Sequence, residues 1–210
     1  MFTVKKRLLG NDTLLEGSLL PDNLEEIYLE ILERREEIYP NCLSAKQDSD
    51  YDYITTDWYT YHDYVCVEKF PKLKFIFPYI AQSLDLMEDP KRDYYFKSWI
   101  NIWPEGQSIG LHTHYGKWHG YFVIKDTGTT TYYFPKNSID PVPLTNHDGH
   151  YVFMSAKIPH LAQTNPSKQL RMSMGFNISD WSEVLREEED NAHGRGPKIR
   201  NVIVPLKEYL

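Results

Sequence analysis

The sequence has little cysteine, no long hydrophobic run and fewer basic than acidic residues. Cys42 and Cys66 are too few for a disulfide framework, so a reducing compartment and a cytoplasmic location are expected. No window approaches about 18 apolar residues, which argues against a membrane span, and the basic N-terminus lacks the apolar segment of a secretory signal. With 23 Lys and Arg against 30 Asp and Glu, the formal charge is −7. That balance argues against binding a nucleic-acid backbone through clustered basic residues.

The remaining composition, 41% hydrophobic and 25% charged, is that of a globular protein, and we expect a single domain over 1–210. Apolar residues recur at helical spacing over 21–39. A second helix is expected over 70–87, interrupted near Pro78. The two helices would form a helical part, 22–88, packed on a β core. The aromatic-rich stretch between them, 41–64, has no sustained period and is expected to be a loop.

Short runs of aromatic and β-branched residues follow Tyr94, separated by Gly, Pro, Asn and Asp. This texture predicts a jelly-roll core over 94–180, and hence a mainly β fold with flanking N-terminal helices. A C-terminal extension, 181–210, is expected to begin with an acidic, solvated helix and to contain a last strand over 201–206. The core strands are expected at 95–103, 109–114, 120–125, 129–134, 151–155 and 170–178.

Histidine is concentrated in one part of the chain, because six of the eight histidines lie within residues 112–160. His112 and His114 are two residues apart in an expected strand, so their imidazoles would point to the same side. His160 follows a later strand that a jelly roll would bring close to the first. Three such histidines can bind a metal ion and leave positions open for other ligands. The alternative is that these are hydrogen-bonded or surface histidines.

The segment 171–177 alternates strictly between polar and apolar residues. Arg171, Ser173 and Asn177 share one face of the expected strand with Gly175, and Met172, Met174 and Phe176 share the other. If the polar face points into the barrel, the guanidinium of Arg171 needs an anion there. A carboxylate fits its two parallel donors, and the Ser173 hydroxyl adds a third. The alternative is a structural ion pair on a solvated sheet face.

Several short motifs occur in order between Trp99 and Asn177, and Arg171 follows His160 after 11 residues and opens an Arg-X-Ser pattern. This ordered series resembles the Fe(II)/2-oxoglutarate-dependent oxygenases, especially a small group common in bacteriophages and marine bacteria. The matching segments are Trp99-Ile100-Asn101, His112-Thr113-His114, Gly120-Tyr121-Phe122-Val123, Gly149 ahead of Tyr151-Val152-Phe153, Ile158-Pro159-His160 and Arg171 through Asn177.

The resemblance implies a double-stranded β-helix, the cupin-like form of the jelly roll, with Fe(II) as metal and 2-oxoglutarate as cosubstrate. It implies that His112 and His160 are iron ligands. Arg171 and Ser173 would bind the distal carboxylate of 2-oxoglutarate, whose other end chelates the metal. Asn101 and Tyr121 would make further contacts with the cosubstrate.

One position departs from the family pattern, which usually has Asp or Glu two residues after the first histidine, where this chain has His114. Three interpretations are open. His114 is the third ligand of a three-histidine site; or it turns away and leaves two protein ligands and an extra open position, as in halogenating relatives; or metal binding is lost or uses another carboxylate, with Asp126 and Asp148 nearby. Replacing a carboxylate by imidazole removes one negative charge from the metal site.

The other histidines of this region carry less of the argument. His119 would either line the pocket or lie in a loop. His147 and His150 flank the hairpin signal Asp148-Gly149 and are expected to be exposed turn residues.

The resemblance implies an oxidoreductase, a non-haem Fe(II)- and 2-oxoglutarate-dependent dioxygenase that hydroxylates a C–H bond. Small molecules, amino acids and peptides are the expected substrates. Two alternatives remain: a cupin-like metalloenzyme with three histidines that does not use 2-oxoglutarate, and a non-catalytic jelly-roll binding module. An inward-facing Arg171 argues against the first, and the histidine enrichment argues against the second.

Overall fold

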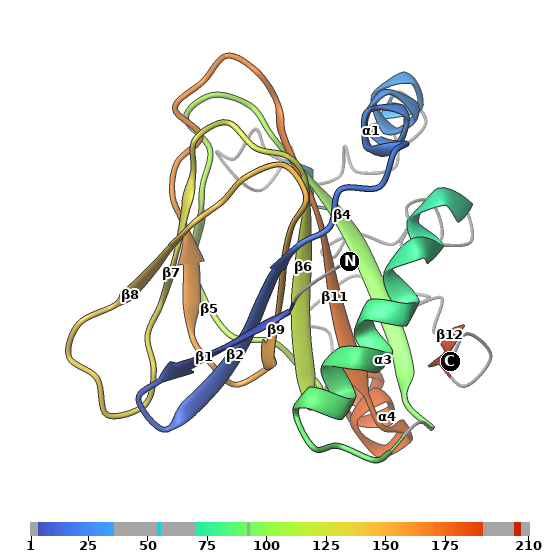
Figure 1. Cartoon of the computed structure of the whole chain (residues 1–210), viewed down its shortest axis with the longest axis vertical. Helices are drawn as coiled ribbons and strands as arrows, with labels where there is room; N and C mark the ends of the chain where they lie inside the picture. Colours follow the sequence, from blue (N-terminus) through green and yellow to red (C-terminus); the bar gives the residue numbers. More distant parts are fainter. Residues whose placement is uncertain (1–3, 36–53, 56–69, 92, 191–203, 207–210) are drawn as a thin grey trace.

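Two antiparallel β-sheets face each other in the computed structural model, with helices on the outer side of the larger sheet (Figure 1). The structure describes residues 4–35, 54–55, 70–91, 93–190 and 204–206. The larger sheet contains β1 (Lys5–Leu9), β2 (Asp12–Ser18), β3 (Ile54–Thr55), β4 (Tyr95–Trp103), β6 (Trp118–Lys125), β9 (His150–Ser155), β11 (Arg171–Ser179) and β12 (Val204–Pro205). The smaller sheet contains β5 (Ile109–His112), β7 (Thr130–Tyr133), β8 (Val142–Thr145) and β10 (His160–Ala162).

The strand order brings distant parts of the sequence together. The larger sheet runs β1-β2-β9-β6-β11-β4-β12, with β3 also paired to β4, and the smaller runs β5-β10-β7-β8. Strand β11 therefore lies between β6 and β4, and β10 lies between β5 and β7. This arrangement confirms the predicted jelly roll and the mainly β class.

Strand β11 is buried along its whole length, which explains its strict alternation. Met172, Met174 and Phe176 pack into a core shared with the helices on the outer side. Arg171 and Ser173 point the other way, into the space between the two sheets. Since successive side chains alternate between the faces of a strand, one short sequence serves both the hydrophobic core and a polar cavity.

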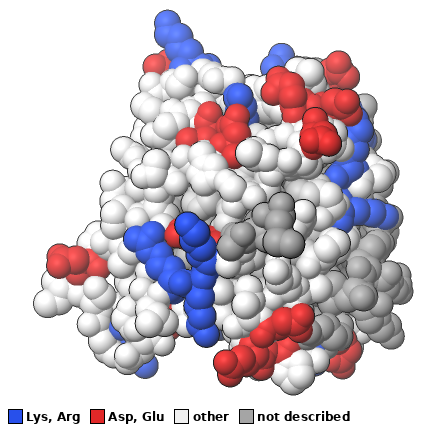
Figure 2. Space-filling model, viewed as in Figure 1, with Lys and Arg blue, Asp and Glu red and all other residues white. Residues whose placement is uncertain are grey.

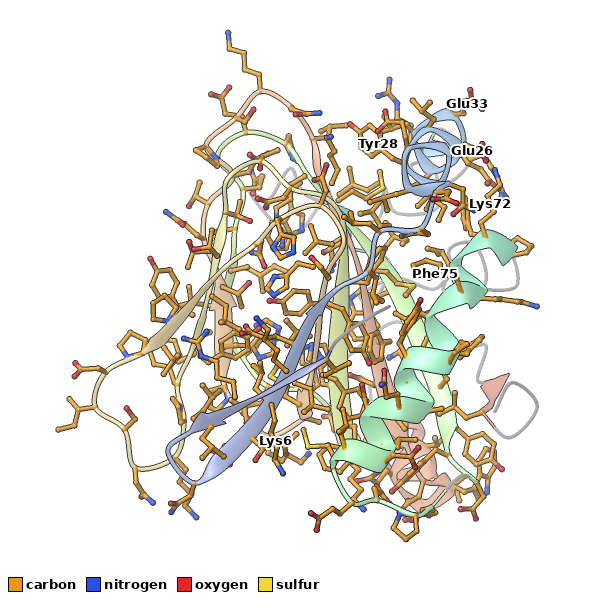
Figure 3. The ribbon with its side chains drawn as sticks, viewed as in Figure 1. Lys6, Glu26, Tyr28, Glu33, Lys72 and Phe75 are labelled. Atoms are coloured by element: carbon orange, nitrogen blue, oxygen red, sulfur yellow. The ribbon has the colours of Figure 1, made fainter. Side chains whose placement is uncertain are left out.

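Three helical elements cover the outer face of the larger sheet: α1 (Leu24–Glu33), the 3₁₀ helix η3 (Pro71–Ile76) and α3 (Phe77–Leu86). The ring of Phe75 meets that of Phe122 on β6 edge-on, with 5.1 Å between centroids. Lys72 points toward α1 and lies 3.4 Å from Glu26 and 3.3 Å from Glu30 (Figure 3). Apolar packing holds the helices to the sheet, and exposed ion pairs such as these add little to stability.

The helices differ from the prediction at their boundaries. Helix α1 begins at Leu24 and ends at Glu33, and residues 36–39 lie outside the described part of the chain, as does 41–64 apart from 54–55. The expected interruption near Pro78 is a change of helix type beside it. The 3₁₀ helix gives way to α3 at Phe77, and Pro78 lies in the first turn of α3, where a missing N–H leaves no hydrogen bond unmade.

The β core extends beyond 94–180, because the hairpin β1–β2 adds two strands to the larger sheet. Leu14 pairs with Met154 of β9, and Gly10 makes the turn with a φ of +61°. The short strands β8 and β10 were also not predicted, and the strand expected over 109–114 ends at His112.

The C-terminal part contains α4 (Trp181–Asp190), which confirms the expected acidic helix, and β12, which pairs with β4. Among the helices described, none has the length and apolarity that crossing a membrane would need. On the face shown in Figure 2, Lys and Arg side chains lie in separate small groups.

A buried carboxylate ties the end of α3 to the first residues of β4 and β6. Asp89 is 6% exposed and accepts hydrogen bonds from the Tyr94 hydroxyl at 2.6 Å and the Trp118 indole at 2.7 Å. The Lys117 ammonium lies 3.0 Å away. Burial alone would raise the pKa of Asp89, but these hydrogen bonds outweigh it and lower the pKa to about 2. The ionised carboxylate is therefore the form that the fold stabilises.

We expect Asp89→Asn to lower the free energy of unfolding by about 2 kcal/mol at pH 7. Because the folded pKa lies below the unfolded value of 3.8, this contribution is complete above pH 3.8 and disappears as the pH falls toward about 2. Urea unfolding of both proteins between pH 7 and pH 3 measures the difference. If the difference in the free energy of unfolding between the two proteins stayed constant with pH, the charge of Asp89 would not contribute to stability. Asp93→Asn, at an exposed aspartate, is the matched control.

Candidate metal and carboxylate-binding site

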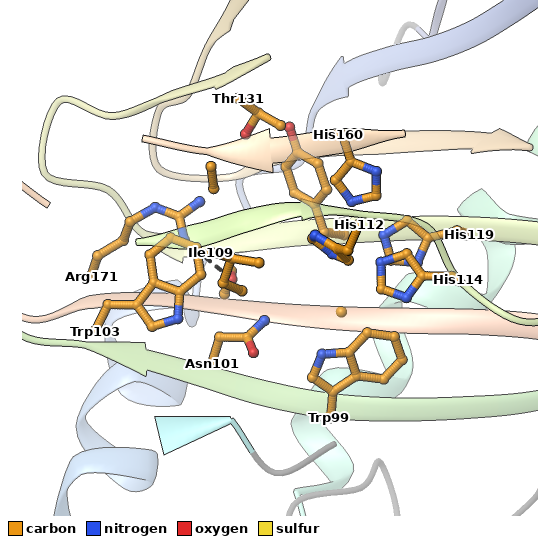
Figure 4. Close-up of a pocket in the computed structure, with 14 residues that line it drawn as sticks. Trp99, Asn101, Trp103, Ile109, His112, His114, His119, Thr131, His160 and Arg171 are labelled. Atoms are coloured by element: carbon orange, nitrogen blue, oxygen red, sulfur yellow. Dashed lines mark hydrogen bonds between the residues drawn. The ribbon is translucent and has the colours of Figure 1, made fainter. Parts of the chain in front are cut away.

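A cavity open to solvent lies between the two sheets (Figure 4). The larger sheet supplies residues of β4, β6 and β11, and the smaller sheet supplies residues of β5, β7 and β10. The lining consists of Trp99, Asn101, Trp103, Ile109, His112, His114, His119, Tyr121, Thr131, His160, Ala162, Arg171, Ser173 and Gly175. Every metal- and cosubstrate-binding residue named from the sequence is among them, so the fold brings them all to one cavity.

His112, His114 and His160 come together at one end of this cavity. Their potential ligand atoms all lie within 4.8 Å of one another. His112 and His160 are directly opposite each other in the β5–β10 pairing, and their rings are 4.5 Å apart. His114 follows β5, and its ring lies 4.8 Å from that of His112. In the described part of the chain, this group of three contains no carboxylate.

Backbone carbonyls orient two of the three rings. Nδ1 of His112 donates to the carbonyl of Gly110 at 2.7 Å, and Nδ1 of His160 donates to that of Ile158 at 3.0 Å. In each neutral ring this leaves Nε2 as the nitrogen with the lone pair. A hydrogen bond from the second ring nitrogen to a carbonyl is the usual support of a metal-binding histidine.

The pKa values of His114 and His160 favour neutral imidazoles. Burial, followed by the neighbouring His112, lowers the pKa of His160 to about 3. Burial also moves the pKa of His114 well below its usual value, and the nearby histidines act in the same direction. A neutral ring is the form that coordinates a metal ion, so no proton has to be displaced at pH 7.

The loop carrying His114 is fixed by hydrogen bonds to strands on both sides. The His114 amide donates to the carbonyl of Ala156 at 2.9 Å, and the Lys117 amide donates to that of Ile178 at 3.0 Å. Gly116, at a φ of +90°, lies so close to Ser179 that a side chain there would clash with it. The loop therefore holds His114 toward the cavity although the residue lies beyond the end of β5.

Arg171 is 2% exposed and lies at the opposite end of the cavity from His114 (Figure 4). Nε donates to Thr129 Oγ1 at 2.9 Å and lies 3.7 Å from a carboxylate oxygen of Asp126. Nη1 lies 3.4 Å from the Ser173 hydroxyl, and the guanidinium lies over the ring of Trp103 at 4.3 Å. Thr129 and Asp126 hold the guanidinium through Nε, and the Nη nitrogens lie on the side of the cavity.

Asn101 and Tyr121 lie between the two ends. The side-chain oxygen of Asn101 is buried and has no hydrogen-bond partner among the described residues. The Tyr121 hydroxyl accepts a hydrogen bond from Tyr133 at 2.8 Å and donates to Asn146 at 3.3 Å. The Asn101 oxygen can therefore accept a hydrogen bond from a donor group, whereas the Tyr121 hydroxyl is already bonded within the protein.

His119 lies in β6 and not in a loop, so the expectation that it lines the pocket is the correct one. It is 2% exposed, and Nδ1 donates to the side-chain oxygen of Asn177 at 3.0 Å. Its ring stacks on that of His114, with 3.5 Å between centroids and 8° between planes. This contact fixes the plane of the His114 ring.

The structure corrects the prediction for His150 and places Asp126 and Asp148 away from the three histidines. His150 is 3% exposed and bonded to Asn146, so the expectation of an exposed turn holds for His147 alone. Asp126 lies beside Arg171, and Asp148 pairs with Lys125 at 3.0 Å. Neither carboxylate belongs to the histidine group, so neither supplies a ligand to that group in the described part of the chain.

Sequence reasoning missed the two indoles of the cavity, Trp99 and Trp103. They alternate with Asn101 on β4, so an inward-facing Asn101 implies that both indoles face inward too. Gly175 makes room for one of them, because a Cβ there would lie 2.5 Å from the Trp99 ring. Trp99 and Trp103 lie two residues before and two residues after Asn101, and this spacing in a strand could have predicted that they line the cavity.

No model of a known protein family matches the sequence, and no curated protein matches it. Solved structures do match the fold. A Pseudomonas putida prolyl-4-hydroxylase is 12% identical with a TM-score of 0.55, covering 82% of this chain and 95% of its own. The non-heme alpha ketoglutarate dependent epimerase SnoN from nogalamycin biosynthesis is 13% identical with a TM-score of 0.56, covering 80% of this chain and 78% of its own. At such identities the likeness shows the fold, a double-stranded β-helix.

Proposed function

We propose that this protein is a non-haem Fe(II)- and 2-oxoglutarate-dependent oxygenase. The observation that carries the proposal is the pairing, within one cavity, of three clustered histidines and a buried arginine with terminal nitrogens directed inward. One end offers neutral nitrogen ligands to a metal ion, and the other offers donors to a carboxylate. The similar SnoN structure was solved in complex with Fe³⁺ and alpha ketoglutarate, which supports this combination of ligands.

The residues present fit an iron ion and 2-oxoglutarate. His112, His114 and His160 would hold the metal and leave other coordination positions open for the cosubstrate. The buried guanidinium of Arg171 is a donor group that a carboxylate of 2-oxoglutarate would satisfy. When bound, iron supplies the redox chemistry that converts 2-oxoglutarate and O₂ to succinate and CO₂ and hydroxylates a substrate C–H bond.

The residues of the chain would bind and orient 2-oxoglutarate and would exclude water from the site. Arg171 and Ser173 would hold the distal carboxylate and so set which end of 2-oxoglutarate reaches the histidines. Trp99 and Ile109 add apolar surface to the cavity and limit the water beside the metal. Asp126 and Thr129 keep the guanidinium in place by binding Nε from behind.

Anaerobic addition of Fe(II) and 2-oxoglutarate tests the proposal. A metal-to-ligand charge-transfer absorption band is expected, followed by succinate formation when O₂ is admitted. Fe(II) binding without a band would favour a three-histidine metalloenzyme that does not use 2-oxoglutarate. Absence of metal binding would leave the non-catalytic binding module.

His114→Asp tests whether His114 is a ligand. If it is, the variant should retain the metal and bind 2-oxoglutarate about tenfold more weakly, because the carboxylate lowers the positive charge that attracts the dianion. Isothermal titration with Zn(II), and then with 2-oxoglutarate, measures both affinities. Unchanged affinities for both would show that His114 does not touch the metal. His147→Asp places the same charge at an exposed histidine and serves as the control.

A further inference from the structure

The indole N–H of Trp103 is a buried donor without an acceptor. Trp103 is 2% exposed, and Nε1 has no hydrogen-bond partner among the described residues. Leaving such a donor unsatisfied is costly, and native structures rarely do so without a reason. An indole N–H can only donate, so whatever satisfies it must bring an acceptor atom.

This donor lies where the cavity is already positive. The guanidinium of Arg171 stacks over the Trp103 ring at 4.3 Å, and both side chains line the same end of the cavity (Figure 4). Nε of Arg171 is occupied by Thr129, whereas the Nη groups and the Ser173 hydroxyl lie toward the cavity. A guanidinium, a hydroxyl and an indole, each a hydrogen-bond donor, therefore line the same end of the cavity.

The donors at this end suit a carboxylate, whose two oxygens offer about four lone-pair positions. The two Nη groups carry four N–H bonds, of which one is donated to Ser173 Oγ, and the hydroxyl and the indole N–H add one donor each. A ligand with a hydroxyl or an amide at this end would satisfy fewer of them, so the cavity favours an ionised carboxylate.

We propose that Trp103 is a further cosubstrate-binding residue, with Nε1 donating to the distal carboxylate that Arg171 and Ser173 hold. This inference rests on the proposed function and assigns to Trp103 a role that the sequence resemblance does not contain. Asn101, two residues away on the same face of β4, presents its orphaned oxygen farther along the cavity. The third buried atom without a partner, Ser98 Oγ, is on the other face of the strand.

The indole N–H signals of the five tryptophans give a direct test by ¹H–¹⁵N NMR of the full chain, with Zn(II) as the diamagnetic metal. The spectrum of Trp103→Phe identifies the signal of Trp103. Addition of 2-oxoglutarate should move this signal strongly downfield. The Trp118 indole, already bonded to Asp89 at 2.7 Å, is the internal control and should stay in place. Succinate, which also has a carboxylate at each end, should cause a shift in the same direction.

Binding measurements separate the possible outcomes. Trp103→Phe keeps a ring beneath Arg171 and should raise the dissociation constant of 2-oxoglutarate about tenfold while leaving Zn(II) affinity unchanged. Binding of 2-oxoglutarate with an unmoved Trp103 signal would overturn the role of Trp103 and leave the proposed function intact. No binding of 2-oxoglutarate to the wild-type protein would overturn both.

Discussion

Arg171→Ala is expected to weaken the binding of 2-oxoglutarate by about 100-fold or more and to leave metal affinity within about threefold of the wild-type value. Removing one partner of a buried, charge-assisted contact costs about 2–5 kcal/mol, and about 1.4 kcal/mol corresponds to each factor of ten. The metal ligands are at the other end of the cavity, so they lose no contact (Figure 4). Isothermal titration with Zn(II), followed by 2-oxoglutarate, measures the two affinities separately.

The buried Asp126 complicates this substitution, because it lies 3.7 Å from the guanidinium and would lose its counter-charge. The double variant Arg171→Ala with Asp126→Asn removes both charges and keeps the test interpretable if the single variant is unstable. An equal loss of metal and 2-oxoglutarate affinity in a folded variant would contradict the role assigned to Arg171.

His160→Ala is expected to reduce metal affinity by more than about 100-fold, since loss of a direct ligand exceeds the 10–100-fold effect of losing a supporting hydrogen bond. His160 is 5% exposed and opposite His112 in the β5–β10 pairing, so no other histidine of the cluster can take its place without moving a strand. Competition with a chromogenic chelator measures the affinity for Zn(II) and Co(II).

The matched control for this variant is His147→Ala, which removes an exposed histidine bonded to Ser18. It should bind metal as the wild type does. If His160→Ala retained wild-type affinity, the three histidines would not form the metal site. Circular dichroism of the metal-free proteins checks that the fold is intact in both variants.

The sequence predicted the long inner strands well. Strand β4 was expected at 95–103 and is found there, and β11 differs from 170–178 by one residue at each end. Both are long, rich in aromatic or alternating apolar residues and bounded by turn residues, so their period is clear. The cavity residues on them could be named because one inward-facing residue fixes the direction of its neighbours at i±2.

The short strands and the buried polar residues were harder to predict. Strand β10 contains only three residues, too few to show a period, although it carries His160. The hairpin β1–β2 begins with Lys5, Lys6 and Arg7, whose charges hide the alternation behind them. The burial of His150 depends on Asn146, four residues earlier in sequence, and on tertiary packing that no local pattern reports.

Two of the three clustered histidines, His112 and His160, belong to strands of the smaller sheet, whereas Arg171 and Ser173 belong to the larger one. A chelated dicarboxylate would therefore link the sheets across their interface. Strand β5, which pairs only with β10 among the described strands, should gain the most from that link. Its amide hydrogens should exchange with solvent more slowly once both ligands are bound, and the stabilisation should grow with the logarithm of ligand concentration. Binding of the cosubstrate and the stability of strand β5 would therefore be coupled.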